Sequence, residues 1–358
     1  MSEDTSFEIS EKTLKEIKKK KKEMGFSKKS WDDWFQSLFE DQKSESTQEK
    51  IERIFEKTTL DTYYDEWIQN FSSNLDYIKS GYSARDLIPD SPSSSSSAIV
   101  IGRGPSIKKH NHLEILSKSN YQGTVICTDG SLINALKSGI TPDRFKKFFV
   151  ITIDTQERQK KSYDDPIVKK YGKQIKCILS STVSSHTYKI VKESGMQVYW
   201  IHTLVDYDKG KSSFNYISGL MTKTKTNPRG LPAIQTGGNV GTSAWIVGWN
   251  ILKHTHVGLI GIDHGYYSDE RSSDDHILPD GDINSSKFKK AYPKIHNPIY
   301  NVTCIQDPIF QYYSNALKEF ILKASKYVKT INATEGGTIF GNGIECVTLK
   351  NFIKNFNF

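Results

Sequence analysis

The feature that most constrains the fold is an alternation of short apolar runs with helical stretches, which begins at residue 98. The apolar runs are rich in β-branched residues and lie at 98–101, 124–127, 148–153, 175–179, 198–201, 257–262 and 327–332. Apolar residues at helical spacing occur at 131–138, 184–194, 242–253 and 308–326. Strands that are apolar throughout are typical of a sheet buried on both faces. The alternation therefore predicts an α/β fold with a mostly parallel sheet flanked by helices.

A different pattern occupies residues 1–90, which are charged and carry apolar residues at helical spacing. One apolar stripe spans residues 31–39 and a second spans residues 64–78, as expected for helices with one buried face. Residues 91–97 consist of Ser and Pro and have nothing to bury, which is typical of a linker. We therefore expect an α-helical N-terminal extension over 1–90, a linker over 91–97 and an α/β domain over 98–358. The N-terminal helices are a candidate contact surface for a protein partner.

The charge divides in the same way. The whole chain has 49 Lys and Arg against 41 Asp and Glu, a formal charge of +8. Residues 1–97 hold 15 basic and 20 acidic side chains and carry −5, so residues 98–358 carry +13. The sequence contains no helix-turn-helix, ribonucleoprotein or zinc-module pattern, which argues against nucleic acid as a partner. A basic domain of this kind suits a small substrate that carries phosphates.

Hydropathy and cysteine usage indicate the compartment. No run approaches the roughly 18 consecutive apolar residues that a membrane-spanning helix needs, and the first residues, Met-Ser-Glu-Asp, lack the apolar segment of a signal peptide. The four cysteines lie far apart, with no Cys-x-x-Cys pair, as expected of free thiols in a reducing compartment. We expect a cytoplasmic protein without a membrane span.

Three aspartates follow predicted strands directly. Asp129 follows the second strand, Asp154 the third and Asp263 the sixth. Because the carboxyl ends of parallel strands share one edge of a sheet, these side chains are candidate ligands for Mg²⁺, which proteins hold with one or two carboxylates plus substrate phosphates. Asp129 alone also suits a helix cap. His264, next to Asp263, is the first candidate for acid–base chemistry, with a structural role as the alternative.

Two glycine-rich loops are candidate phosphate sites. Gly102, Arg103, Gly104 and Ser106 follow the first strand, where backbone N–H groups and an arginine suit an anion. An ordinary tight turn is the alternative.

The second loop is more specific. It contains Gly237, Gly238, Asn239, Gly241 and Thr242 and precedes an apolar helix near residue 244, with Thr242 and its neighbouring serine as expected caps. Such a helix start favours anions. A glycine-rich connection required for packing of a helix on the sheet is the alternative.

These ordered motifs resemble a known family. The segments concerned are 98–106, 127–131 with 139–143, 236–242, 259–263 and the late 332–337 segment, Asn-Ala-Thr-Glu-Gly-Gly. Over roughly residues 98–345 they are similar to the 6-hydroxymethylpterin diphosphokinase MptE-like proteins. The resemblance implies a Rossmann-like α/β fold related to the sialyltransferase-like group.

The resemblance also implies a transferase that uses an anionic nucleotide. One line of the family moves pyrophosphate from ATP, with Mg²⁺, onto a hydroxymethyl-dihydropterin; the other, in motility-accessory glycosyltransferases, moves a nonulosonic sugar from CMP onto protein. Pterin kinases of the family carry Thr-Asp-Leu-Asp-Gly after the third strand, whereas this chain has only the last aspartate, Asp154. A His-Gly-Asp-Asn element is replaced by residues 200–203 with Asp206, and the form of residues 238–242 is closer to the glycosyltransferases.

Three hypotheses follow. In the first, the protein is a Mg²⁺-dependent diphosphotransferase that acts on ATP and a pterin-like acceptor, with Asp263, His264 and Arg103 as catalytic residues and the two loops as the nucleotide site. In the second, it is a CMP-sugar glycosyltransferase with the same loops and with His264 or His202 as base. In the third, it is a nucleotide-binding or scaffold protein without catalysis, which recruits a partner through its N-terminal helices. The nucleotide and a small-molecule acceptor are the expected partners of the first.

Overall fold

The computed structural model describes residues 11–23, 30, 47–267, 272–273, 276–277 and 292–358. The chain divides into two compact units, Met1–Ile54 and Phe55–Phe358. The first unit contains helix α1 (Glu11–Glu23) and the start of α3 (Thr47–Ser80), which ends in the second unit. The expected helical character of the N-terminal region is confirmed for these two helices; the predicted stripe at 31–39 lies outside the described residues.

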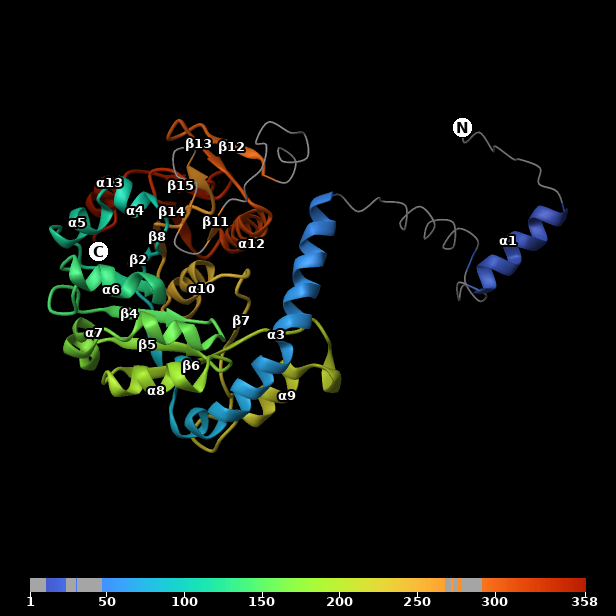
Figure 1. The fold of residues 1–358 in the computed structure, drawn as a ribbon, viewed down its shortest axis with the longest axis horizontal. Coiled ribbons are helices and arrows are strands. Elements are labelled where there is room, and N and C mark those ends of the chain that lie inside the picture. Colours follow the sequence, from blue (N-terminus) through green and yellow to red (C-terminus); the bar gives the residue numbers. More distant parts are fainter. Residues whose placement is uncertain (1–10, 24–29, 31–46, 268–271, 274–275, 278–291) are drawn as a thin grey trace. The chain divides into compact units, whose positions relative to one another are not determined.

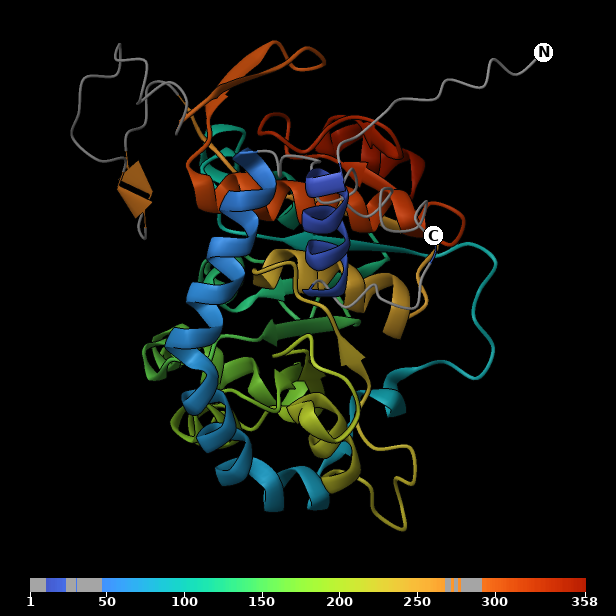
Figure 2. The ribbon, with the colours of Figure 1, turned by 90° about the vertical axis from the view of Figure 1, so that its right-hand side faces the viewer.

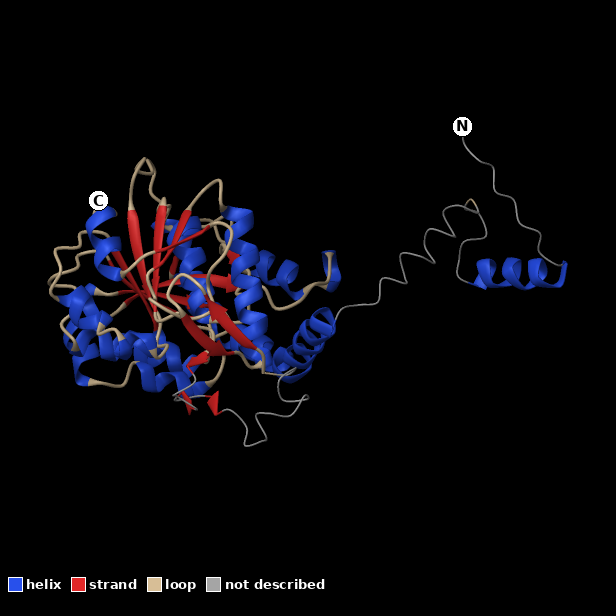
Figure 3. Cartoon of the chain, turned by 90° about the horizontal axis from the view of Figure 1, so that it is seen from above, coloured by secondary structure: helices blue, strands red, loops and turns tan. Residues whose placement is uncertain are grey.

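The second unit is built on a parallel sheet that lies between helices (Figures 1 and 3). Its strand order is β1-β6-β5-β4-β3-β2-β8-β14-β15, and β7 pairs with β6. The strands are β1 (Tyr82–Ser83), β2 (Ser97–Ile101), β3 (Thr124–Thr128), β4 (Phe148–Thr152), β5 (Lys176–Ser180), β6 (Gln197–Thr203), β7 (Ala233–Ile234), β8 (His256–Ile260), β14 (Lys329–Asn332) and β15 (Ile344–Cys346). Each of the seven predicted strands overlaps one of these, so the predicted fold class is confirmed.

The apolar strands pack against two layers of helices. Successive strand residues point to opposite faces, so Ile99 and Ile101 belong to one core cluster and Ala98 and Val100 to the other. The first cluster includes buried residues of α3, α5 (His112–Ser117), α6 (Asp129–Lys137), α7 (Pro166–Tyr171), α8 (Ser185–Glu193) and α13 (Leu349–Asn355). The second includes buried residues of α10 (Val240–Ile246), its π-helical continuation η5 (Val247–Ile251) and α12 (Pro308–Ala324).

Shorter elements connect these layers. They are η1 (Ala84–Leu87), α4 (Ser106–Lys109), η2 (Glu157–Ser162), η3 (Gly172–Gln174), η4 (Gly210–Ser212) and α9 (Phe214–Met221). A second sheet contains β9 (Tyr266–Tyr267), β12 (Lys294–Asn297) and β13 (Val302–Ile305), and β10 (Ser272–Ser273) pairs with β11 (His276–Ile277). None of the helices in the described part of the chain is both long and apolar enough to cross a membrane.

The domain boundary differs from the expected one. The sequence predicts a division at 91–97, but the structure divides the chain after Ile54. Residues 55–90 belong to the second unit because Phe71 of α3 is buried in the core and β1 extends the sheet by pairing with β6. The Ser/Pro segment is therefore an internal connection that leads into β2.

Helix α3 covers part of the carboxyl edge of the sheet (Figure 2). Asn70 Nδ2 donates to Thr155 O (3.2 Å), just beyond β4, and Asn74 Nδ2 donates to Ser181 O (3.2 Å) and Val183 O (2.7 Å), just beyond β5. These two amides satisfy carbonyl groups that the ends of the strands leave unpaired.

The strand order reverses between β2 and β8. From β2 the chain builds the sheet outward through β3, β4, β5 and β6, and then returns to place β8 on the other side of β2. In open parallel sheets, ligands bind beyond the carboxyl ends of the strands at such a reversal. The loops after β2 and β8 are therefore the place to examine for a site.

Candidate functional site

The loops after β2 and β8 lie against each other. Gly102 N donates to Ile260 O (2.8 Å) and Gly104 N donates to Gly261 O (2.9 Å). A Cβ atom on Gly102 would lie 2.3 Å from Gly261 O, and one on Gly104 would lie 1.9 Å from Asp263 Oδ2. Both glycines are therefore explained by the close approach of the two loops.

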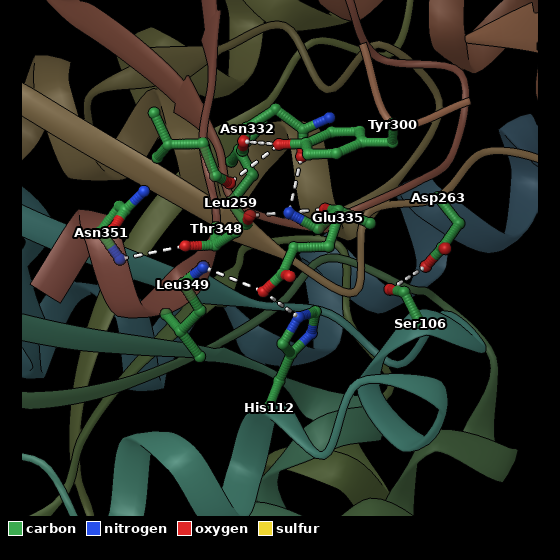
Figure 4. Close-up of polar contacts among 12 residues, drawn as sticks. Ser106, His112, Leu259, Asp263, Tyr300, Asn332, Glu335, Thr348, Leu349 and Asn351 are labelled. Carbon is green, nitrogen blue, oxygen red and sulfur yellow. Dashed lines mark hydrogen bonds and ion pairs between the residues drawn. The ribbon is translucent and has the colours of Figure 1, made fainter. Parts of the chain in front are cut away.

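Asp263 joins these loops. Its Oδ2 accepts from Ser106 Oγ at 2.8 Å (Figure 4). Its Oδ1 accepts from Tyr267 OH, also at 2.8 Å. The side chain is buried, and burial raises its pKa to about 6 although both hydrogen bonds lower it. Because each carboxylate oxygen already accepts a hydrogen bond, Asp263 serves in this structure to hold the β2 loop, and Ser106 is buried with it.

Asp129 has a different environment. It is the first residue of α6, and the cap residue is Thr128, so Asp129 does not cap the helix. Its Oδ1 accepts from Gly130 N (2.7 Å), whereas its Oδ2 is buried and has no hydrogen-bond partner within the usual distance and angle, although the Thr152 hydroxyl lies near enough to lower the pKa of the carboxyl. Burial raises the pKa of Asp129 to about 6, and the nearby negative charge of Asp154 contributes to this rise, against the lowering by the hydrogen bond from Gly130 N and by the Thr152 hydroxyl. A buried, unpartnered carboxylate oxygen needs an explanation, such as a ligand or ion.

Arg103 and Asp154 complete this group. A Cβ on Gly130 would lie 2.8 Å from Arg103 Cδ, so the arginine side chain passes over the start of α6, and its positive charge lowers the pKa of Asp129. Asp154 Oδ1 accepts from Gln156 N (3.0 Å) and its Oδ2 accepts from Gln159 Nε2 (2.6 Å). The edge thus places two acidic groups and one basic group together beyond β2, β3 and β4.

The loop before α10 is capped by a residue other than those expected. Asn239 Oδ1 accepts from Thr242 N (2.9 Å), and Asn239 Nδ2 donates to Thr242 Oγ1 (2.9 Å). The helix therefore begins at Val240, two residues before the predicted caps, because the Asn side chain reaches the free N–H of the first turn. Gly241 packs against Ile262, where a Cβ would lie 2.8 Å from Cδ1.

Two tyrosines of α12 cover the glycines of this loop. Gly238 has a φ of +81°, and a Cβ there would lie 2.5 Å from Tyr313 Cε1 and 2.8 Å from Tyr312 Cε1; Gly237 has a φ of +57°. Burial raises the pKa of Tyr313 to about 12, and the charges of Asp307, Asp154 and other neighbours add to the rise. Tyr313 therefore lies within electrostatic range of the acidic group. The sequence prediction missed this wall because α12 is distant along the chain and its tyrosines match an ordinary amphipathic helix.

The two candidate bases lie in unfavourable settings for proton transfer. His264 is buried with a φ of +45°, its Nδ1 makes no hydrogen bond, and burial lowers its pKa to about 3. Its ring stacks on Phe310 at 6.1 Å between centroids. His202 Nδ1 bonds Ser181 Oγ (2.7 Å), and its Nε2 lies 3.1 Å from Asn215 Oδ1. His202 therefore has a structural environment, and His264 has too low a pKa for an efficient base at neutral pH.

A further polar network lies behind the β8 loop, and local spacing in the sequence does not predict its contacts. Glu335 Oε1 accepts from Leu349 N (3.0 Å) and lies 3.3 Å from His112 Nε2, so it joins α5 to the start of α13 (Figure 4). Gly337, two residues further on, has a φ of +69°, and a Cβ there would lie 2.7 Å from Asp263 O. The resemblance had marked residues 332–337, and their role here is to support the β8 loop from behind.

The three strand-end aspartates do not form one cluster. Among the described residues, no group of three or more His, Cys, Asp or Glu side chains is arranged to hold a metal ion. Asp129 and Asp154 interact with each other, while Asp263 is committed to Ser106 and Tyr267. Asp263 is separated from the other two aspartates because β2 lies between β3 and β8. The loop after β2 fills the space between the carboxyl ends of these two strands.

Comparisons with known proteins agree with the motifs. The profile of the family described as 6-hydroxymethylpterin diphosphokinase MptE-like matches residues 69–269, more than half of the chain. This match starts within α3, ahead of the expected start at residue 98. A solved structure, the MAf glycosyltransferase from Magnetospirillum magneticum AMB-1, is similar with a TM-score of 0.48 and 14% identity; the alignment covers 76% of this chain and 38% of that chain. The search of curated proteins gave no match. The chain belongs to the 6-hydroxymethylpterin diphosphokinase MptE-like family.

Proposed function

We propose that this protein is a nucleotide-dependent transferase that moves pyrophosphate from ATP to a hydroxymethyl-dihydropterin-like acceptor. Membership of a family named for a diphosphokinase supports a transferase. The finer proposal rests on one observation: the buried, unpartnered Oδ2 of Asp129 at the carboxyl edge of the sheet, beside Arg103 and Asp154.

The residues present fit a Mg²⁺ ion. Asp129 offers an orphaned oxygen, and Asp154 supplies a second charge close enough to raise the pKa of Asp129. Two carboxylates plus phosphate oxygens form a typical protein site for Mg²⁺. The ion would neutralise phosphate charge when bound. Asp263 is no longer a proposed ligand, because its side chain is buried between Ser106 and Tyr267. The Asp154 oxygens also accept hydrogen bonds, but this side chain is only half-buried beyond β4.

The chain's own residues then have distinct tasks. Arg103, exposed at the end of β2, neutralises phosphate charge as AMP leaves. Tyr312 and Tyr313, which lie next to Gly238, offer aromatic surface for the purine or the pterin ring. The acceptor hydroxyl oxygen forms a bond to the β-phosphorus of ATP, the bond from that phosphorus to the oxygen of AMP breaks, and the hydroxyl proton passes to solvent.

A second candidate is transfer of a sugar from a CMP-sugar. It is favoured by the form of residues 238–242, which is closer to the glycosyltransferases of the family than to its pterin kinases. In this reaction the acceptor hydroxyl oxygen forms a bond to the anomeric carbon, the bond from that carbon to the phosphate oxygen of CMP breaks, CMP leaves with the bonding electrons, and the hydroxyl proton passes to solvent. The same loops would hold the phosphate of CMP.

A nucleotide panel separates the two candidates. ATP, CTP and CMP, each with and without Mg²⁺, are compared by the thermal unfolding midpoint of the full chain. A ligand at about 100 times its Kd stabilises by about 2.7 kcal/mol, which gives a rise of several degrees. A rise with ATP and Mg²⁺ only, lost in Asp129→Asn, supports the diphosphotransferase. A rise with CMP or CTP but not ATP contradicts it and supports the glycosyltransferase.

The control variant is Asp164→Asn. Asp164 is exposed beyond the candidate site, so this variant removes one carboxylate without changing the acidic group at the edge. We expect it to respond to every nucleotide as the wild type does.

A further inference from the structure

Helix α9 is anchored by one face. Phe214 and Ser218 are buried, and the Phe214 ring packs edge-on against Phe71 of α3 at 5.2 Å between centroids. Asp206 fixes the start of the helix, since its Oδ1 accepts from Ser213 Oγ (2.8 Å) and its Oδ2 accepts from Phe214 N (2.8 Å). The orientation of the helix is therefore set, and so is the face that it turns outward.

The outward face of α9 is apolar. Tyr216, Ile217, Leu220 and Met221 are 48%, 41%, 50% and 41% exposed, respectively. A surface helix normally places polar residues opposite its buried stripe. Four adjacent large apolar side chains on an eight-residue helix form a patch of the kind that marks an interaction site. We call these four residues the α9 face.

The chain around the α9 face is basic. Residues 207–229 contain one acidic residue, Asp208, and five exposed basic residues: Lys209, Lys211, Lys223, Lys225 and Arg229. The basic residues lie in the two loops that flank the helix, on both sides of the apolar patch. A membrane that contains anionic lipids offers negatively charged phosphates next to apolar acyl chains. An apolar face with a basic rim is complementary to such a surface.

We propose that the α9 face binds the surface of an anionic lipid membrane. The apolar side chains enter the boundary between headgroups and acyl chains, where the phenol of Tyr216 keeps its hydroxyl group in the headgroup layer. The lysines of the flanking loops contact lipid phosphates. The protein lies on the membrane without crossing it, and the interaction is independent of the reaction proposed above.

Vesicle co-sedimentation of the full chain tests this proposal. Vesicles of phosphatidylcholine with about one third phosphatidylglycerol are compared with pure phosphatidylcholine. We expect the protein to sediment with the anionic vesicles only, and to be released at high salt because lysine–phosphate attraction is screened. Lys223→Gln/Lys225→Gln should lower the partition coefficient about 25-fold, since each basic residue near the surface contributes about fivefold.

The apolar part is tested separately. Ile217→Glu/Leu220→Glu places two carboxylates on the exposed face, so it should abolish sedimentation while it leaves the thermal midpoint nearly unchanged. The matched controls are Lys350→Gln/Lys354→Gln, two exposed lysines of α13, and Leu322→Glu, a 55% exposed position of α12. Both controls should bind vesicles as the wild type does.

Several results overturn the proposal. They are failure of the wild type to bind anionic vesicles, equal binding to pure phosphatidylcholine, and a loss of binding in the control variants that equals the loss in the α9 variants. Light scattering measures the oligomeric state. If the wild type is a dimer that does not bind vesicles, and Ile217→Glu/Leu220→Glu makes it a monomer, the α9 face binds a second copy of the chain and the lipid proposal is rejected.

Discussion

Replacing Asp129 with Asn should stabilise the protein and inactivate it. Burial raises the pKa of this carboxyl from 3.8 to about 6. At neutral pH the carboxylate is ionised in both states, and its charge is less stable in the folded protein than in the unfolded chain. A rise of about 2 pKa units corresponds to about 3 kcal/mol of stability lost at pH 7. The Asn side chain removes the charge and can still accept from Gly130 N through its Oδ1 atom. We expect a gain of about 1–3 kcal/mol in the free energy of unfolding at pH 7, together with loss of nucleotide-dependent turnover.

The pH dependence fixes the sign of this effect. Because the folded-state pKa lies above the unfolded value, the folded protein binds the proton more tightly, and the contribution of Asp129 to stability falls as pH rises from 3.8 to about 6. Below this window the carboxyl is neutral in both states. The difference between Asp129→Asn and the wild type should therefore grow through the window and become constant above it.

Urea unfolding at a series of pH values, followed by tryptophan fluorescence, measures this difference. Asp164→Asn, an exposed control, should stay within about 0.5 kcal/mol of the wild type at every pH. A difference that does not change with pH, or an Asp129→Asn variant less stable than the wild type at pH 7, would refute the reasoning. Either result would mean that Gly130 N, the Thr152 hydroxyl and Arg103 offset the cost of burying the Asp129 charge.

Two further predictions concern the loops and the boundary. Gly104→Ala should lose about 2–3 kcal/mol of stability, because the new Cβ would lie 1.9 Å from Asp263 Oδ2; an unchanged urea midpoint would contradict the close approach of the loops. Deletion of residues 1–54 should leave a cooperative unfolding transition in calorimetry, whereas deletion of 1–90 should abolish it, because Phe71 is core. If the protein that lacks residues 1–90 unfolds cooperatively at the wild-type midpoint, the domain boundary lies at the Ser/Pro segment, as the sequence predicts.

The sheet could be predicted because its strands are apolar on both faces. Ile99 and Val100 point to opposite core clusters, so burial requires continuous runs that are visible in the sequence. β1 has two residues and gains its place only by pairing with β6, so no local pattern marks it. This pairing also explains why the domain boundary differs from the expected one. A Ser/Pro loop inside a domain has the same composition as a linker between two domains, so the sequence does not distinguish them.

The place of the candidate residues in the fold could be predicted, but their contacts could not. The rule that polar residues after parallel strands gather at one edge identified Asp129 and Asp154. The engagement of Asp263 depends on Ser106, which lies 157 residues away in the sequence, and the tyrosine wall of α12 is likewise a long-range contact. Pairings of this kind have no signature in a single sequence, because they are set by the strand order and not by local spacing.

The measurement that tests the central claim most directly is phosphorus NMR of the full chain with ATP, Mg²⁺ and a hydroxymethyl-dihydropterin. The account predicts AMP and a pterin diphosphate in equal amounts, with neither formed by Asp129→Asn. ATP that stays intact with the wild type, or that yields ADP in place of AMP, would contradict the proposed transfer.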